Sequence, residues 1–67
     1  MPFTLKYKDL DEKREIPNES YTIKDLLNEL ELSAQTIVSK QNRELVIEDT
    51  VIGENDEIQL IQIIYGG

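Results

Sequence analysis

The residues with the clearest chemical potential are the last two, Gly66 and Gly67, which follow the strand-like run 58–65. Glycine accepts backbone angles that other residues avoid and lets another backbone approach closely, so two glycines suit a segment that must enter a narrow cleft. We therefore expect the carboxylate of Gly67 to be the reacting group. The plain alternative is a frayed chain end, because termini are usually disordered unless they are tied down.

The size and composition of the chain argue against chemistry of its own. Its 67 residues make one small domain, and a domain of this size buries only about 60% of its unfolded surface. Histidine, cysteine and tryptophan are absent, so the usual base near neutral pH, the thiol nucleophile and the soft metal ligands are missing. We expect a protein that is not an enzyme and that binds no cofactor tightly, no metal and no membrane. Without an apolar leader, we expect a cytoplasmic monomer.

The charge balance indicates the kind of partner. Fourteen acidic and seven basic residues give a net charge of −7, which repels phosphate backbones and argues against direct nucleic-acid binding. Acidic residues also crowd the stretch just before the last apolar run, either as a solvated face or as a docking surface for a basic partner. These residues are Glu44, Glu48, Asp49, Glu54, Asp56 and Glu57.

A hairpin is predicted at the amino terminus. Apolar and polar residues alternate over 3–8, with Phe3, Leu5 and Tyr7 facing one side, as in a half-buried strand. The polar run 9–12 is expected to form a turn, and residues 13–16 a returning strand that ends at Pro17 and Asn18.

One helix is predicted in the middle of the chain. Thr22, with Asp25 three residues later, has the pattern of a capping box, so the helix should begin there. Apolar residues then recur at helical spacing, and residues 33–35 should end the helix. The apolar stripe must pack on a sheet, because an isolated helix of this length is marginal in water. The stripe consists of Ile23, Leu26, Leu27 and Leu30.

Three further strands are expected in the second half. Short β-branched stretches at 36–39 and 45–47 flank the polar turn 40–44. A second polar turn, 52–57, contains Gly53 and Asn55, either of which can take the left-handed conformation.

The last run, 58–65, is the strongest strand. Its alternation places Ile58 and Leu60 under the helix and Ile61, Ile63 and Tyr65 on the other face. If it runs beside the first strand, it is a central strand whose end projects from a rigid body. An apolar patch beside a reactive tail is a reasonable docking surface, although these residues could also pack under a loop.

The elements together predict an α+β roll in which one main helix lies across one face of a mixed sheet of four to five strands. We expect residues 1–64 to form the domain and residues 65–67 an exposed tail that ends in Gly-Gly.

This order of elements resembles the ubiquitin-like β-grasp proteins, and among them the ThiS/MoaD-like sulfur carriers of thiamine and molybdopterin synthesis and the small archaeal modifiers. Residues 22–30 look like the family's threonine-capped helix, 53–58 resemble its acidic turn, and Gly66-Gly67 match its terminus. Two departures concern the turns: Asn55 stands where glycine is common, and Arg43 stands where the sulfur carriers often have glycine.

The resemblance implies that Gly67 is a substrate of other enzymes. A partner E1-like enzyme would use ATP to join the Gly67 carboxylate to AMP. Attack by a sulfur donor would give a thiocarboxylate for thiamine, molybdopterin or tRNA thiolation, whereas attack by an amine would join Gly67 to lysines of target proteins. A third reading is a non-covalent adaptor with the same fold, for which the ending at Gly67 would be incidental.

The remaining predicted site residues surround Gly67 along the chain. Gly66 would supply a narrow approach, and the extended residues 63–67 would reach about 17 Å into a partner's active site. The residues expected to contact partners are Ile61, Ile63, Ile64, Tyr65 and Gly66.

Overall fold

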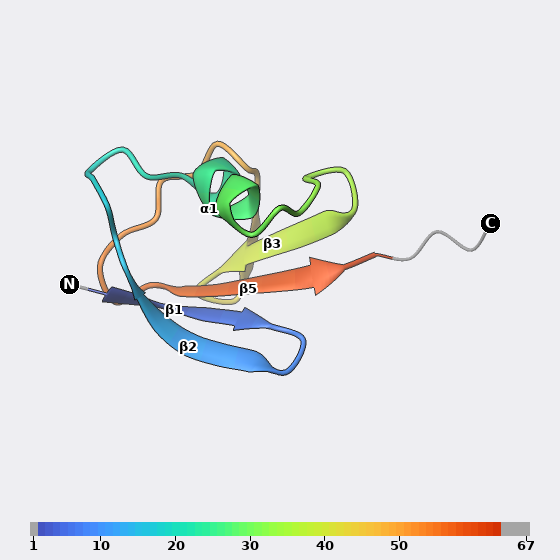
Figure 1. Ribbon diagram of the computed structural model, residues 1–67, viewed down its shortest axis with the longest axis horizontal. Helices are drawn as coiled ribbons and strands as arrows, with labels where there is room; N and C mark the ends of the chain where they lie inside the picture. The colour runs from blue at the N-terminus through green and yellow to red at the C-terminus, as the bar shows by residue number, and fades with distance from the viewer. Residues whose placement is uncertain (1, 64–67) are drawn as a thin grey trace.

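A mixed sheet of five strands forms the body of the protein, with one helix lying across one face (Figure 1). The computed structural model describes residues 2–63. Strand β1 is parallel to β5, while the β1–β2, β3–β5 and β3–β4 pairs are antiparallel, giving the order β2-β1-β5-β3-β4. The fold class predicted from the sequence is confirmed. The elements are β1 (Pro2–Tyr7), β2 (Leu10–Glu15), α1 (Ile23–Glu29), β3 (Ile37–Gln41), β4 (Glu44–Val46) and β5 (Glu57–Gln62).

The amino-terminal hairpin is tighter than expected. Tyr7 pairs with Leu10, so the turn consists of Lys8 and Asp9 alone, and the prediction of a turn over 9–12 was wrong. Lys8 has a φ of 54°, the left-handed region that such short turns require. Sequence patterns did not predict this register because β2 is almost wholly charged, a composition more typical of a turn than of a strand.

Helix α1 begins where the sequence predicted. The Thr22 hydroxyl accepts the Asp25 amide at 3.3 Å, and the Asp25 carboxylate accepts the Thr22 amide at 3.0 Å, which completes the capping box.

The helix ends earlier than predicted, at Glu29 instead of within 33–35. The amide of Leu32 donates to the carbonyl of Leu27, and the amide of Glu31 to that of Asn28. Glu31 has a φ of 59°, so this is a Schellman ending with glutamate in the position that glycine usually takes. Leu32 then packs against the core. Because position 31 is glutamate and not glycine, the usual sequence signal for the end of a helix is missing.

The β3–β4 turn is also shorter than predicted. Gln41 pairs with Glu44, which leaves Asn42 and Arg43 as the turn in place of the whole of 40–44. Both have positive φ, 51° and 74°, as a two-residue turn of the primed kind requires. In the next turn Asn55 has a φ of 65°, so Asn55, not Gly53, adopts the left-handed conformation.

The core lies between α1 and the inner face of the sheet. The predicted stripe is confirmed for Ile23, Leu26 and Leu27, each at most 2% exposed, while Leu30 packs at the margin. Among the described residues no helix is long and apolar enough to cross a membrane. The buried apolar residues are Phe3, Leu5, Tyr21, Ile23, Leu26, Leu27, Ile37, Ile52, Ile58 and Leu60.

Candidate functional site

Strand β5 connects the folded body to the predicted reactive residues. It is the middle strand of the sheet, paired with β1 on one side and β3 on the other. Beyond its last residue, the amide of Ile63 still donates to the carbonyl of Thr36 at 2.8 Å. The backbone is therefore held to the body up to Ile63, just beyond the end of β5, whose arrow points to the right in Figure 1.

Only some of the predicted site residues belong to the part of the chain that the structure describes. Ile61 and Ile63 belong to the described part of the chain, while Ile64, Tyr65, Gly66 and Gly67 lie outside it. The predicted boundary between residues 64 and 65 also falls outside the described residues.

Alternation along β5 is as predicted. Ile58 and Leu60 are 0% and 3% exposed beneath the helix, whereas Ile61 is 38% exposed on the opposite, outer face. Ile63, just past the end of β5, is half-buried, and the period of two places it on the same face as Ile61.

Cross-strand register adds a neighbour to Ile61. Val38 of β3 pairs directly with Ile61, and paired residues share a face. We call Val38, Ile61 and Ile63 the outer-face patch. The sequence indicated Ile61 and Ile63 but not Val38, because the register of a short β-branched stretch cannot be read without its partner strand.

A polar row borders the outer-face patch. Lys6 of β1 and Lys40 of β3 flank Gln59 of β5, and Leu45 of β4 follows Lys40 at the edge of the sheet. The Lys6 ammonium lies 3.7 Å from the Glu57 carboxylate. The patch is thus apolar beside a mixed-charge strip, a composition found in surfaces that bind other proteins.

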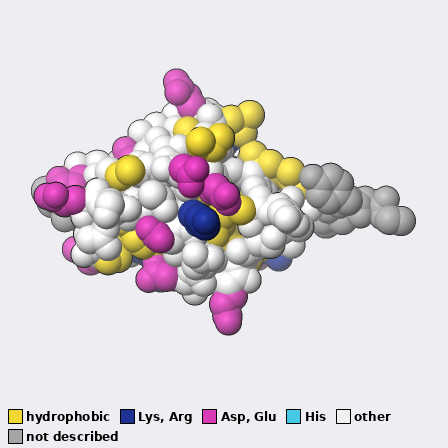
Figure 2. Space-filling view, turned by 90° about the horizontal axis from the view of Figure 1, so that it is seen from above, with side chains coloured by type: hydrophobic (Ala, Val, Ile, Leu, Met, Phe, Trp, Pro, Cys, Tyr) yellow, Lys and Arg dark blue, Asp and Glu magenta, His cyan; other side chains and the backbone are white. Residues whose placement is uncertain are grey.

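The acidic stretch before β5 does not form one surface. Acidic side chains are spread over the helix side of the molecule, as Figure 2 shows, while hydrophobic side chains gather along one margin that runs toward the undescribed end. Glu57 pairs with Lys6, and Asp56 is engaged inside the turn. Two of the six acids are thus engaged within the fold, and the six do not form a single docking surface.

Asp56 organises the turn that precedes β5. Its carboxylate accepts the Gly53 amide and the Gln41 side-chain amide, both at 2.7 Å, and the Asn42 side-chain amide at 3.0 Å. Burial opposes ionisation of Asp56, but these hydrogen bonds outweigh it and hold the pKa of the carboxyl below its usual value. The network ties the β3–β4 turn to the start of β5 and so fixes where β5 begins.

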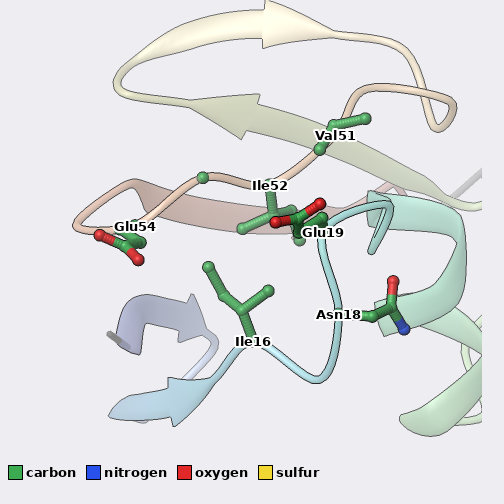
Figure 3. Close-up of a pocket in the computed structure, with 7 residues that line it drawn as sticks. Ile16, Asn18, Glu19, Val51, Ile52 and Glu54 are labelled. Carbon is green, nitrogen blue, oxygen red and sulfur yellow. The ribbon is translucent and has the colours of Figure 1, made fainter.

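A groove of about 350 Å³ opens between the segment after β2 and the loop before β5 (Figure 3). The side chains of Ile16 and Ile52 face each other across it, with the carboxylates of Glu19 and Glu54 nearby. It contains none of the predicted site residues. Within residues 2–63, no group of three or more acids could hold a metal ion.

Comparison with known proteins agrees with this geometry. The model of the ThiS family matches residues 3–67 of the chain. The crystal structure of SAMP1 from Haloferax volcanii superposes with a TM-score of 0.72 at 19% identity, covering 100% of both chains. The crystal structure of the thiamine biosynthesis protein ThiS from Geobacter metallireducens gives 0.65 at 19% identity, covering 96% of this chain and 99% of the other. These likenesses establish a ubiquitin-like β-grasp fold. No curated protein matches the sequence.

Proposed function

The chain belongs to the ThiS family, and from this premise we propose that it is a sulfur carrier whose Gly67 carboxylate is adenylated by an E1-like enzyme. The carboxylate attacks the α-phosphorus of ATP and pyrophosphate leaves. A sulfur nucleophile in the oxidation state of hydrosulfide then attacks the acyl carbon, and AMP leaves. Gly67 ends as a thiocarboxylate that supplies sulfur in thiamine, molybdopterin or tRNA thiolation.

One observation carries the proposal: the family match extends from residue 3 through Gly67, over a body whose middle strand leads into the last residues. A central strand with both neighbours paired is a rigid support, because its backbone groups are satisfied on both sides. An acyl group that must reach the site of another enzyme is best held by such a support.

The outer-face patch supports a docking role. A small protein that is a substrate of larger enzymes must be held while its end reacts. We propose that Val38, Ile61 and Ile63 contact the activating enzyme, because apolar side chains beside a polar strip are typical of interfaces. ATP is then bound and used by the partner, and the carrier needs no cofactor of its own.

The same first step serves a second candidate function. After adenylation, attack by a lysine amine in place of sulfur would join Gly67 to a target protein, as in a modifier. The superposition with SAMP1 over the whole of both chains is compatible with this role. The ThiS structure superposes comparably, so the fold does not separate the two candidates. Lys6, Lys8, Lys13, Lys24 and Lys40 are the acceptors that this chain itself offers.

Two variants with an altered carboxyl terminus test the proposal. One variant lacks Gly67, and another carries an added alanine after it. With ATP and the E1-like enzyme of the same cell, both should fail to form the adenylate, because each removes or displaces the reacting carboxylate. Ser33→Asp, an exposed change in the loop after α1, is the control and should be activated normally. Full activation of the extended chain would contradict the proposal.

A further inference from the structure

The two edges of the sheet differ in the side chains beside their unpaired backbone groups. In an antiparallel pair, alternate residues direct their amide and carbonyl groups toward the partner strand or away from it. Because Tyr7 and Leu10 flank a two-residue turn, the outward groups of β2 belong to Asp11, Lys13 and Glu15. All three side chains are charged, which is a known protection against unwanted strand pairing.

The other edge lacks this protection. Gln41 and Glu44 flank the β3–β4 turn, so the next pair, Lys40 and Leu45, does not share hydrogen bonds. Two hydrogen bonds confirm which backbone groups of β3 point toward β5. The Asn42 amide donates to the Glu57 carbonyl, and the Ile63 amide donates to the Thr36 carbonyl, so the even-numbered residues of β3 direct their amides and carbonyls toward β5. The amide and carbonyl of Leu45 therefore point away from the sheet, and no described strand lies beyond β4.

Apolar side chains accompany this open edge. Leu45 is 69% exposed and Ile47 71% exposed, more than the other large exposed hydrophobic residues of the described chain. Exposed apolar groups that gather at one place mark interaction sites.

A groove of about 460 Å³ lies behind β4, with a mainly apolar lining. It is bounded by the loop after α1, by β3 and by β4, so a side chain on the inner side of an added strand would enter it. The lining residues are Leu27, Ala34, Gln35, Ile37, Val38, Ser39, Val46, Ile47 and Glu48.

The charges at this edge select the occupant. Glu44 is exposed on β4 beside Leu45, Glu48 lines the groove, and Asp49 is exposed just beyond it. Arg43, at the turn, is the one basic residue within 43–49. A partner segment with a basic side chain opposite Glu44 complements this edge, while an acidic one is repelled.

We propose that β4 receives an extended segment of a partner protein, which adds antiparallel to the sheet as a sixth strand. In this arrangement a single residue of the added strand forms hydrogen bonds with both the amide and the carbonyl of Leu45. From amino to carboxyl end, the segment presents an apolar side chain at Val46 and the groove, an apolar side chain beside Leu45, and a basic side chain opposite Glu44. The site goes beyond the proposed chemistry of Gly67 and does not depend on it.

The probe is the peptide acetyl-Thr-Val-Val-Lys-Thr-amide, titrated into the isotopically labelled full chain and followed by amide resonances. We expect saturable shifts at Leu45, Ile47 and Ala34, with little change on β2. A peptide N-methylated at the central valine lacks the donor to the Leu45 carbonyl and should bind about tenfold more weakly. A peptide with glutamate in place of lysine should also bind more weakly.

Three variants localise the site. Leu45→Lys, at an exposed position, should abolish the shifts without unfolding the chain, while Lys13→Ala on the β2 edge should leave them unchanged. Glu44→Gln should remove the preference for lysine over glutamate. Equal binding of the N-methylated peptide, shifts spread over β2 or over Ile61 and Ile63, or no saturable binding would each overturn the proposal. No adenylation is involved, so failure here is independent of the function of Gly67.

Discussion

The two faces of the sheet differ most clearly along β5, which contributes to both. On the inner face Ile58 and Leu60 are at most 3% exposed and lie beneath α1, whereas on the outer face Gln59 and Ile61 meet solvent. Stability therefore depends mainly on the inner face, and the outer face is available for partners. The difference shows how a chain of 67 residues can leave apolar side chains exposed on one face of its sheet without weakening its core.

The largest effect is expected on the inner face. Ile58→Ala removes a side chain that is 0% exposed, and it should lower the free energy of unfolding by about 3 kcal/mol through lost burial and the cavity left behind. Urea denaturation measures this loss. A cost below about 1 kcal/mol would mean that the inner face does not carry the stability of the fold.

The second largest effect is expected on the outer face of the sheet, where a substitution should weaken adenylation of Gly67. Ile61→Asp should leave the midpoint of unfolding nearly unchanged, because Ile61 is 38% exposed. It should weaken adenylation by about thirtyfold, roughly 2 kcal/mol, through a charge placed in the docking contact. Pyrophosphate exchange with the E1-like enzyme measures it, with Ser33→Asp as a control of equal charge change. Unchanged kinetics in a folded Ile61→Asp protein would count against docking at this face.

A smaller effect is expected from the polar network that fixes the start of β5. Asp56→Asn weakens hydrogen bonds from Gly53, Gln41 and Asn42 and should cost about 1 kcal/mol at neutral pH. The pKa of Asp56 is lower in the folded state than in the unfolded chain. Its contribution is therefore complete above the unfolded pKa of about 3.9 and is lost as the pH falls through the folded value.

Unfolding measured from neutral to acidic pH tests this assignment. The loss of stability below about pH 4 should be shallower in Asp56→Asn than in the natural sequence. Asp9→Asn, in the exposed β1–β2 turn, is the matched control and should leave the slope unchanged. Parallel curves for the natural protein and Asp56→Asn would refute the role of the network.

The smallest effect belongs to a turn outside the comparison of faces. Arg43 has a φ of 74°, which costs energy in a residue with a side chain. Arg43→Gly should raise the free energy of unfolding by about 0.5 kcal/mol, the relief of strain being partly offset by the greater freedom of glycine in the unfolded chain. Thermal unfolding measures it. A decrease in stability would show that the Arg43 side chain makes a compensating contact.

The sequence predicted the parts of the fold whose signals are local. Thr22 and Asp25 formed the expected capping box, and the helical stripe and the alternation of Phe3 and Leu5 identified core residues. The errors fell at turns. The turn at Lys8, the helix end at Glu31 and the turn at Arg43 all place ordinary residues in left-handed geometry, so no glycine marked them.

The candidate site was predicted in part, for a related reason. Alternation indicated the outward face of Ile61, but Val38 and the open edge at Leu45 follow from strand register, which the sequence does not encode locally. The predicted roles of Ile64, Tyr65, Gly66 and Gly67 stay predictions.

The carrier function is measured most directly by the intact mass of the protein recovered from its native cell, together with a digest of total cell protein. We expect a fraction of the recovered chain to carry sulfur in place of one oxygen, located by fragmentation on Gly67. Oxygen alone on Gly67, with lysines of other proteins bearing the remnant of this tail, would contradict the carrier function and establish the modifier instead.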